Sequence, residues 1–421
     1  MWWLACTPAP KQNVYLKTMS DVWVTGLGLR SAAGNSISDF GDALSQNRFC
    51  GYDAQSELDV SHVARVLDVE NDYDALFPDD RKCTLGYGAA LDALKQSKLD
   101  GLSHIRSVIY LGTGLSSITP DEFEVDIFPH LENGKLSRQT MAEDLRSDLP
   151  SPNRHLPNRF AAVLAERLGH TGLVGTNFSA CAAAAQAMAE GFFTLRRGEA
   201  DVALVGGHDS MDHPMGLLSF LVLGALSPEY CRPFDAHRNG FMLGEGAAMF
   251  VLEREAHARA RGVKPLAKIS GAGTSIDANN ATAPHEEGMG AALAMRRAMR
   301  FAGLKASDIG YVNAHGTGTP LGDVAESLAI QRVLGSQVPV SSIKGAIGHT
   351  IAAAGALEGA ACIWALLNDT LPGTVGLNEL DSKCPVNALK EPLHQRVQHI
   401  ISNSFGFGGQ NASLIFSRVE P

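Results

Sequence analysis

The sequence predicts an α/β fold built of packed layers, and three observations support it. Short β-rich runs alternate with helical segments, and a similar order of segments resumes after about residue 260. The chain has 421 residues and is 45% hydrophobic, which is enough for a substantial core. Because no low-complexity linker divides the two parts, we expect one integrated unit of two similar halves.

The first half carries apolar runs of strand length, bounded by glycine and polar residues, which are typical of buried strands. They cover residues 21–28, 107–114, 172–179, 202–210 and 247–253. Alanine and leucine recur at helical spacing in residues 159–169 and 182–198, which predicts helices there.

The second half repeats this alternation. Strands are expected at 265–275 and 309–316 and in the closing segment 399–418, and helices at 290–304 and 323–335. Residues 120–158 are the least periodic part and are rich in charge and proline. We expect them to form a surface excursion or a partner interface.

Composition narrows the function. The net charge of −10 argues against nucleic-acid binding, but it leaves room for a local basic patch that binds an acidic partner. No apolar run reaches the roughly 20 residues of a membrane span. The seven cysteines are scattered without a CxxC pair, which favours a reduced compartment over a metal or disulfide framework.

The first 18 residues, MWWLACTPAPKQNVYLKT, make a poor signal peptide, so the expected location is the cytoplasm. We expect this segment to be a disordered arm, a mis-assigned start or a remnant of cloning.

Cys181 lies in NFSACAAAAQ (177–186), after a predicted strand and at the head of a predicted helix. A thiol at a helix N-terminus has a lowered pKa, and the small neighbours leave room for a substrate. Taken alone, the pattern also fits a buried structural cysteine.

Three later motifs favour the catalytic interpretation. NAHGTGTPLGD contains His315, SSIKGAIGHTIAAAGALEG contains Lys344 and His349, and SNSFGFGGQN is a glycine- and phenylalanine-rich loop. The two histidines and the lysine lie at strand-to-helix turns, as Cys181 does, and this predicts one shared site.

These motifs, with VTGLG, SAC and RPFDAHRNGFMLGEGAA, carry a resemblance to a known family. From about Asp21 onward the chain resembles the elongating β-ketoacyl-acyl carrier protein synthases of the thiolase fold. The resemblance implies two βαβαβαββ halves, residues 19–258 and 259–421, that form a five-layered αβαβα core.

The resemblance also implies a decarboxylating Claisen condensation. Cys181 would take the acyl group from an acyl carrier protein. His315 and His349 would then hydrogen-bond the thioester oxygen of a malonyl group as carbon dioxide leaves. Lys344 would pair with Glu358 and hold the charge network in order, or would form a purely structural salt bridge.

The remaining implied roles concern substrate access. The backbone N–H groups of Cys181 and Phe407 would form a second oxyanion hole, and Phe407 with its neighbour Gly408 would gate the acyl pocket. By the same resemblance, the residues expected to contact the substrate and its phosphopantetheine arm are Thr317, Thr319, Leu115 and Thr282.

No cofactor is required beyond the phosphopantetheine of the carrier protein. The positions that match cation ligands in some relatives, or that make simple core hydrogen bonds, are Asn313, Glu358, Ser402 and Asn403. The expected carrier-docking residues, which are otherwise merely solvated, are Arg81, Lys82, Lys135 and Arg138.

The residue set Cys-His-His is similar to that of elongating synthases, whereas thiolases need a second cysteine and initiating synthases carry Cys-His-Asn.

The pathway stays open between fatty-acid synthesis and a specialised polyene or polyketide synthesis. The 225–240 loop is short, and in this it is similar to the loops of aryl-polyene and nodulation-factor synthases. Asn280 replaces a family histidine. The expected partner subunit is a second copy of the chain or a cysteine-less chain-length factor. The alternative hypotheses for the function are a cysteine hydrolase and a non-catalytic scaffold subunit.

Overall fold

The computed structural model describes residues 20–54, 60–67, 77, 80–114, 128–144 and 156–419. The expected N-terminal arm (1–18) and the expected pocket residue Leu115 lie outside these ranges.

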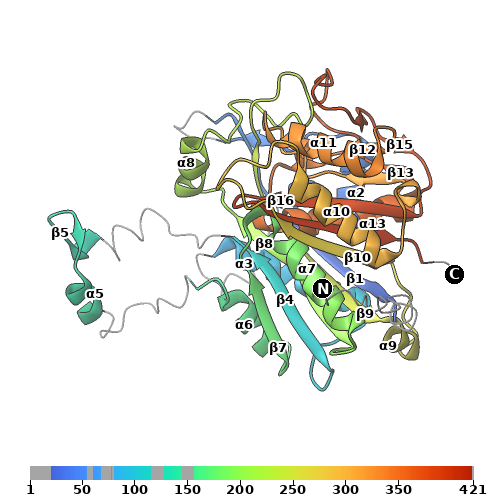
Figure 1. The fold of residues 1–421 in the computed structure, drawn as a ribbon. Coiled ribbons are helices and arrows are strands. Elements are labelled where there is room, and N and C mark those ends of the chain that lie inside the picture. The colour runs from blue at the N-terminus through green and yellow to red at the C-terminus, as the bar shows by residue number, and fades with distance from the viewer. Residues whose placement is uncertain are drawn as a thin grey trace, which may run out of the picture.

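The first half has the order βαβαβαββ (Figure 1). Its elements are β1 (Val22–Ser31), α3 (Arg81–Ser97), β4 (Ser107–Thr113), α6 (Arg159–Arg167), β7 (Leu173–Asn177), α7 (Ala183–Arg196), β8 (Val202–Ser210) and β9 (Leu243–Arg254). The strands lie in the order β7-β4-β8-β9-β1, with β4 parallel to β7 and β8, and with β9 antiparallel to β8 and β1.

The second half repeats the order and the topology. Its elements are β10 (Ala267–Ile276), α10 (Met289–Ala302), β11 (Tyr311–Asn313), α11 (Gly322–Leu334), β12 (Pro339–Ser341), α13 (Ala354–Asn368), β16 (His399–Gly406) and β17 (Gln410–Ser417). The strand order β12-β11-β16-β17-β10 matches that of the first half strand for strand, with the same parallel and antiparallel pairs. The expected duplication is therefore confirmed.

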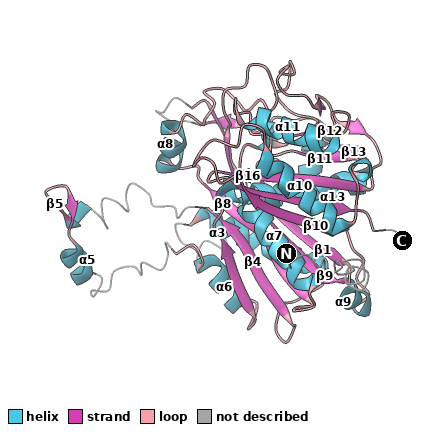
Figure 2. Ribbon diagram, in the orientation of Figure 1, coloured by secondary structure: helices cyan, strands magenta, loops and turns pink. Residues whose placement is uncertain are grey.

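The helices form three layers around these strands, which makes the predicted five-layered core. Helix α3 covers the outer face of the first half, and α10 covers the outer face of the second. Helices α7 and α13 pack against each other and contact strands of both halves, so they form the middle layer. Figure 2 shows the strands running through the body with helices against both faces.

The halves are joined where β1 and β10 pair over three residues, Val22 to Val24. The expected division between residues 258 and 259 falls inside the short helix α9 (Glu255–Ala260), which connects β9 to β10.

Smaller elements complete the chain. They are α2 (Ile37–Ser45), β2 (Tyr52–Asp53), β3 (His62–Ala64), η3 (Phe128–His130), β5 (Leu131–Glu132), β6 (Lys135–Leu136), α5 (Arg138–Asp144), η5 (Ala180–Ala182), α8 (Pro214–Val222), η6 (Ala306–Asp308), α12 (Lys344–Ile347), η7 (Ile351–Ala353), β13 (Thr370–Leu371), β14 (Asn387–Ala388) and β15 (Leu393–His394). Within the expected excursion, β5, β6 and α5 lie apart from the main body (Figure 1).

One stretch, Ile351–Asn368, is long and apolar enough to cross a membrane by length and composition. Of its residues, 89% are buried inside the protein, where η7 and α13 form part of the middle layer. Its hydropathy is thus explained by its place in the core.

The middle layer supplies a test of the core. Leu357 of α13 is fully buried between the two halves, so Leu357→Ala should lower the free energy of unfolding by about 2–5 kcal/mol. Leu367→Ala, on the same helix but half exposed, should cost less than about 1 kcal/mol. Urea unfolding followed by circular dichroism measures both, and equal losses would contradict this layer arrangement.

Candidate active site

The two middle-layer helices begin in the same unusual way. Ala180 precedes Cys181 with φ +48°, and a 3-10 turn then leads into α7. Ile351 has φ +45°, and the 3-10 turn η7 leads into α13. A β-branched residue at positive φ is strained, so the surrounding packing must hold this turn. The duplication thereby brings two strained helix starts, η5 and η7, into contact.

The thiol and the two predicted histidines meet at these helix starts. His349 Nε2 lies 3.1 Å from Cys181 Sγ, and the rings of His315 and His349 are 5.3 Å apart, edge to face. One ligand-type atom from each of the three residues lies within 4.8 Å of the others. All three side chains are buried. The structure therefore brings together the residues that the sequence placed in one site.

The hydrogen bonds fix which ring nitrogens carry protons. The Ile351 N–H donates to His349 Nδ1 at 3.3 Å, and the Lys344 ammonium lies 3.3 Å from His315 Nδ1 as its donor. With both Nδ1 atoms accepting, each neutral ring carries its proton on Nε2. Burial and the Lys344 charge hold the pKa of both histidines well below the usual value, so both rings are neutral at pH 7.

Lys344 is almost completely buried, and its ammonium is fully engaged. It donates to a carboxylate oxygen of Glu358 and, at 2.5 Å, to the carbonyl oxygen of His315. The other Glu358 oxygen accepts from Ser404 Oγ at 3.2 Å. The predicted Lys344–Glu358 pair is confirmed, and it lies directly behind His315.

A thiol and two imidazoles at this spacing would also suit a zinc ion. The Lys344 ammonium beside His315 disfavours a divalent cation there, because like charges in a buried site repel strongly. Two neutral N–H donors that face the pocket are suited instead to a developing negative charge.

The expectation of a lowered pKa at Cys181 is wrong. Burial raises the pKa of the thiol to about 12 and outweighs the Lys344 charge and the Phe407 backbone N–H, which both lower it. The Phe407 N–H and His349 Nε2 both face the sulfur, so the thiolate is stabilised by donors when it forms.

The loop between β16 and β17 comes close to the nucleophile. A Cβ at Gly406 would lie only 3.0 Å from the Ser179 carbonyl oxygen and 3.1 Å from the Cys181 nitrogen, so glycine favours this close approach. Gly408 has φ +84°, and its N–H donates to the Ala281 carbonyl oxygen at 2.7 Å. These contacts hold the loop, and Phe407 with it, next to Cys181, and its gating role stays a prediction.

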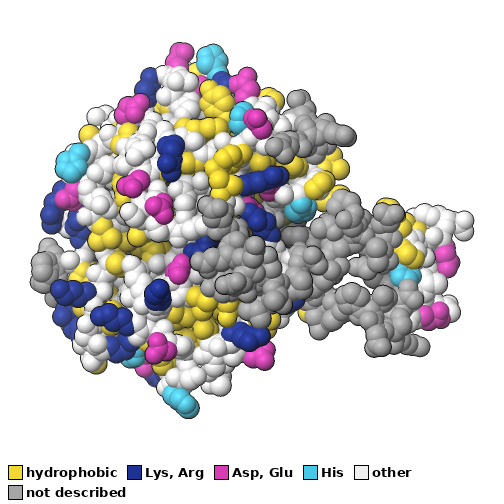
Figure 3. Space-filling view, turned by 180° about the vertical axis from the view of Figure 1, so that it is seen from behind, with side chains coloured by type: hydrophobic (Ala, Val, Ile, Leu, Met, Phe, Trp, Pro, Cys, Tyr) yellow, Lys and Arg dark blue, Asp and Glu magenta, His cyan; other side chains and the backbone are white. Residues whose placement is uncertain are grey.

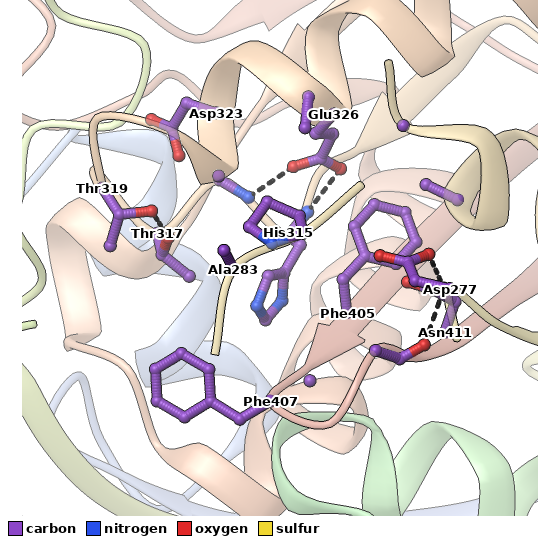
Figure 4. Close-up of a pocket in the computed structure, with 18 of the residues that line it drawn as sticks. Asp277, Ala283, His315, Thr317, Thr319, Asp323, Glu326, Phe405, Phe407 and Asn411 are labelled. Atoms are coloured by element: carbon purple, nitrogen blue, oxygen red, sulfur yellow. Dashed lines mark hydrogen bonds between the residues drawn. The ribbon is translucent and has the colours of Figure 1, made fainter. Parts of the chain in front are cut away.

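A pocket opens beside His315 and His349 (Figure 4). Thr317, Thr319 and Thr282 all line it, as the resemblance implies, and the two Thr317 and Thr319 hydroxyls are 3.0 Å apart. The Phe407 ring projects into the same space (Figure 4). Asn280, the departure from the family pattern, accepts the N–H groups of Thr282 and Ala283 and so shapes this wall.

Three charged residues hold the backbone of the HGTGT loop, and the sequence motifs alone did not single them out. The Glu326 carboxylate accepts the backbone N–H groups of His315 at 2.9 Å and Gly316 at 2.7 Å (Figure 4). Asp323 accepts from Gly318 N–H at 3.1 Å, and Arg238 donates to the carbonyl oxygen of Thr319 at 3.1 Å. Glu326 and Asp323 lie on α11, one turn apart. The sequence pattern that could have revealed Asp323 and Glu326 is a pair of acidic residues, three positions apart, shortly after the HGTGT motif.

The candidate cation residues fit a cation only in part. The Asn313 side chain lies against the buried Tyr311 hydroxyl and the Ser402 hydroxyl against the buried Cys362 thiol, and each contact lowers the pKa of that group against the effect of burial. Glu358 is engaged by Lys344 and Ser404. Asn403 follows Ser402 on β16, so its side chain points to the opposite face, where it contacts Glu326 and Ser413. Glu358 and Asn403 thus have other partners, and a cation bound by Asn313, Glu358, Ser402 and Asn403 stays a prediction.

The candidate docking residues do not form one surface. Arg81 is bound by the buried Glu245 carboxylate at 2.6 Å. Lys82 is 5% exposed on the inner side of α3, so its docking assignment is wrong, because a buried ammonium cannot meet a carrier protein. Lys135 and Arg138 lie on β6 and α5, apart from the main body. Their docking role stays a prediction.

Known proteins match both halves. Residues 19–258 match the N-terminal domain of β-ketoacyl synthases, and residues 266–378 match their C-terminal domain. The chain belongs to the β-ketoacyl synthase family. It is therefore an acyltransferase, a ketosynthase of fatty acid or polyketide synthesis.

Relatives extend over nearly the whole chain. A Schizosaccharomyces pombe protein named as a mitochondrial 3-oxoacyl-[acyl-carrier-protein] synthase is 36% identical and covers 79% of this chain and 80% of its own. The 3-oxoacyl-[acyl-carrier-protein] synthase 2 of Vibrio cholerae is 32% identical and covers 94% and 99%.

Solved structures share the fold. A β-ketoacyl synthase from Burkholderia phymatum is 31% identical with a TM-score of 0.85, covering 96% of this chain and 100% of its own. The ketosynthase ApeO of Xenorhabdus doucetiae, solved with its chain length factor ApeC, is 27% identical with a TM-score of 0.80, covering 95% and 98%.

The raised pKa of Cys181 sets the pH dependence of its alkylation. Because the thiolate reacts, the rate with iodoacetamide should rise about tenfold per pH unit from pH 7 to 10 without a plateau. Peptide mass spectrometry at Cys181 follows this residue separately from the other cysteines, and Cys181→Ala gives the blank. A plateau near pH 7 would show that the helix start outweighs burial.

Glu326 offers a test of loop positioning. Glu326→Gln turns an acceptor of two backbone N–H groups into a side chain with a competing donor, so kcat should fall about 10- to 100-fold. Steady-state condensation kinetics measure this fall. The surface variant Glu287→Gln should leave kcat unchanged, because its ion pair with Arg332 is exposed. An unchanged kcat in Glu326→Gln would contradict the positioning role.

Proposed function

We propose that this protein catalyses a decarboxylative Claisen condensation of an acyl thioester with malonyl-acyl carrier protein, giving a 3-oxoacyl chain two carbons longer. The observation that carries the proposal is the pair of neutral imidazoles, His315 and His349, with Nε2–H groups beside the buried Cys181 thiol. A cysteine hydrolase needs one such histidine, and a scaffold subunit needs no cysteine at this place.

In the first step the Cys181 sulfur attacks the acyl thioester carbonyl, and the carrier thiol leaves with the thiol proton. The N–H groups of Cys181 and Phe407 would stabilise the oxyanion in this step, since the Phe407 N–H already faces the sulfur. Phe407 and Gly408 must move to admit the acyl chain, and the positive φ of Gly408 allows that rearrangement.

In the second step the malonyl carbon–carbon bond breaks. Carbon dioxide leaves, and the electron pair passes to the thioester enolate, whose oxygen accepts from His315 and His349. The enolate carbon attacks the acyl-Cys181 carbonyl, forms the new carbon–carbon bond and releases the thiolate. Burial, together with the Lys344 charge, keeps both imidazoles neutral, and Lys344 at His315 and the Ile351 N–H at His349 orient the rings as fixed donors.

The substrates would be carried on the phosphopantetheine of an acyl carrier protein, with no further cofactor. Thr317, Thr319 and Thr282 line the pocket that reaches His315 and His349, and they would bind the arm. Both fatty-acid and polyketide pathways use this chemistry, and the short 225–240 loop favours a specialised polyene or polyketide pathway.

We expect a dimer in which β7 is the contact strand. It is an edge strand of the sheet, and Leu173 and the following Phe178 are exposed there. The structure of ApeO with a chain length factor supports a heterodimer as the alternative to two identical copies. Sedimentation of the pure chain distinguishes them, since a homodimer forms alone.

The expected compartment is the cytoplasm. All six cysteines among the described residues are free, which fits a reducing environment. The mitochondrial relative from Schizosaccharomyces pombe makes the mitochondrial matrix the alternative.

Intact-mass analysis tests the reaction. Wild type incubated with an acyl carrier protein bearing an acyl chain should gain that acyl mass, and Cys181→Ala should not. Addition of malonyl carrier protein should discharge the adduct with a product two carbons longer.

His315→Asn separates the two steps. It should still acquire the acyl group but should release carbon dioxide about 100- to 1,000-fold more slowly, because one enolate donor is weakened. An adduct on Cys181→Ala, or normal carbon dioxide release by His315→Asn, would contradict the assignment.

A further inference from the structure

One buried carboxylate near the active site has no part in the reaction described above. On the face seen in Figure 3, acidic side chains lie on the surface among basic and apolar ones, as is usual for charged groups. Asp209, near the end of β8, is instead fully buried. It lies close enough to Cys181 that its negative charge adds to the rise in pKa that burial causes at the thiol. A buried charge beside reactive groups is a candidate for a functional role.

The Asp209 carboxylate holds the start of a middle-layer helix. Its Oδ2 accepts the backbone N–H of Ala352 at 3.0 Å, and its Oδ1 accepts the N–H of Ser210 at 2.9 Å. Ala352 is the middle residue of the 3-10 turn η7, which leads into α13. Asp209 thus ties the end of β8, in the first half of the chain, to the helix start in the second half.

The turn that Asp209 holds is the one that orients His349. Ile351 precedes Ala352 with φ +45°, and the Ile351 N–H donates to His349 Nδ1 at 3.3 Å. The N–H groups of Ile351 and Ala352 belong to the two peptide groups on either side of the Ile351 α-carbon. Because both of these N–H groups have partners, both backbone dihedral angles of the strained residue are restrained.

Glycines leave the space that this contact needs. A Cβ at Gly114, directly after β4, would overlap Asp209 Oδ2. A Cβ at Gly207 of β8 would lie 2.9 Å from the Ala352 carbonyl oxygen. The ends of β4 and β8 therefore pack closely around the carboxylate and the turn, and this packing fixes where the carboxylate can lie.

A positive charge compensates the buried carboxylate. Burial raises the pKa of Asp209 to about 6, and the Lys82 charge is the largest of the effects that oppose this rise. The carboxylate is therefore ionised at pH 8. Lys82 is 5% exposed on α3, and its carbonyl oxygen accepts from Nδ1 of His208, the neighbour of Asp209 on β8. The buried ammonium that does not fit the docking expectation thus supports Asp209.

We propose that Asp209 is a positioning residue for the condensation. It fixes η7 through the Ala352 N–H, so that the Ile351 N–H keeps His349 oriented with its proton on Nε2. This inference rests on the proposed function, because it names a residue that positions one of the two enolate donors of that reaction. Asp209 acts through the turn and not on the reacting atoms.

Asp209→Asn tests the proposal. The amide has one oxygen and one donor group, so it cannot accept the N–H groups of both Ser210 and Ala352. On acylated enzyme at pH 8, carbon dioxide release from malonyl carrier protein should slow about 10- to 100-fold, because His349 is less well aimed. The KM for malonyl carrier protein and the rate at which Cys181 is acylated should stay within about 2-fold of wild type.

Glu253→Gln is the matched control. Glu253 is equally buried on the neighbouring strand β9, and its carboxylate accepts from Thr25 and Arg261. Loss of this carboxylate should lower the stability of the protein, but the ratio of the decarboxylation rate to the acylation rate should stay at the wild-type value. A similar fall of this ratio in Glu253→Gln would show a general effect of core damage and would overturn the role of Asp209.

Gly114→Ala moves the carboxylate without removing its charge. The added methyl group would displace Asp209 Oδ2 from the Ala352 N–H, so decarboxylation should again slow more than acylation. An unchanged ratio in folded Asp209→Asn would overturn the proposal, and if circular dichroism shows that this variant does not fold, the ratio in Gly114→Ala decides in the same way.

The wild-type protein separates this proposal from the proposed reaction. Normal acylation and carbon dioxide release by wild type, with the same ratio in Asp209→Asn, would overturn the positioning role alone. Failure of wild type to become acylated or to release carbon dioxide would overturn the reaction itself.

Discussion

The active site depends on one buried positive charge. Lys344 lies in the core with Glu358 as its counter-ion, and its ammonium also donates to the His315 carbonyl oxygen. Burying such a charge is costly unless it is paired and hydrogen-bonded. Burial holds the pKa of His315 and His349 well below the usual value and the Lys344 charge lowers both further, while at Cys181 the same charge lowers a pKa that burial raises more strongly. One ammonium thus acts on the protonation of three reactive groups.

The duplicated fold provides the place for this charge. Each half sends a strained 3-10 turn into a middle-layer helix, and the two turns meet between the sheets. The first turn presents Cys181. The second aims the Ile351 N–H at His349 Nδ1, which fixes the tautomer of that ring. Ala180 and Ile351 pack in one hydrophobic cluster with Cys181, and this packing holds the strained turns.

Acidic side chains on α11 connect the core to the substrate route. Glu326 fixes the backbone at His315, and Asp323 fixes it at Gly318, two residues closer to the surface. Burial raises the pKa of Glu326 to about 7 and that of Asp323 to about 6, and the N–H groups they accept oppose this rise. Further toward the surface, Arg238 fixes the same loop by donating to the carbonyl oxygens of Thr319 and Pro320. The backbone of the HGTGT loop is therefore fixed by side chains along its length.

The sequence by itself determined the layered architecture, the repeated halves and the three reactive residues. Its apolar periodicity is local information, and the Cys-His-His motifs lie at turns that the strands and helices define. The tertiary structure alone decided the raised pKa of Cys181, the burial of Lys82 and the ion pair that commits Arg81. These depend on desolvation and on partners more than 100 residues away along the chain, such as Glu245 for Arg81. No local pattern encodes such contacts, because they arise only when segments far apart in the chain, such as α3 and β9, pack against each other.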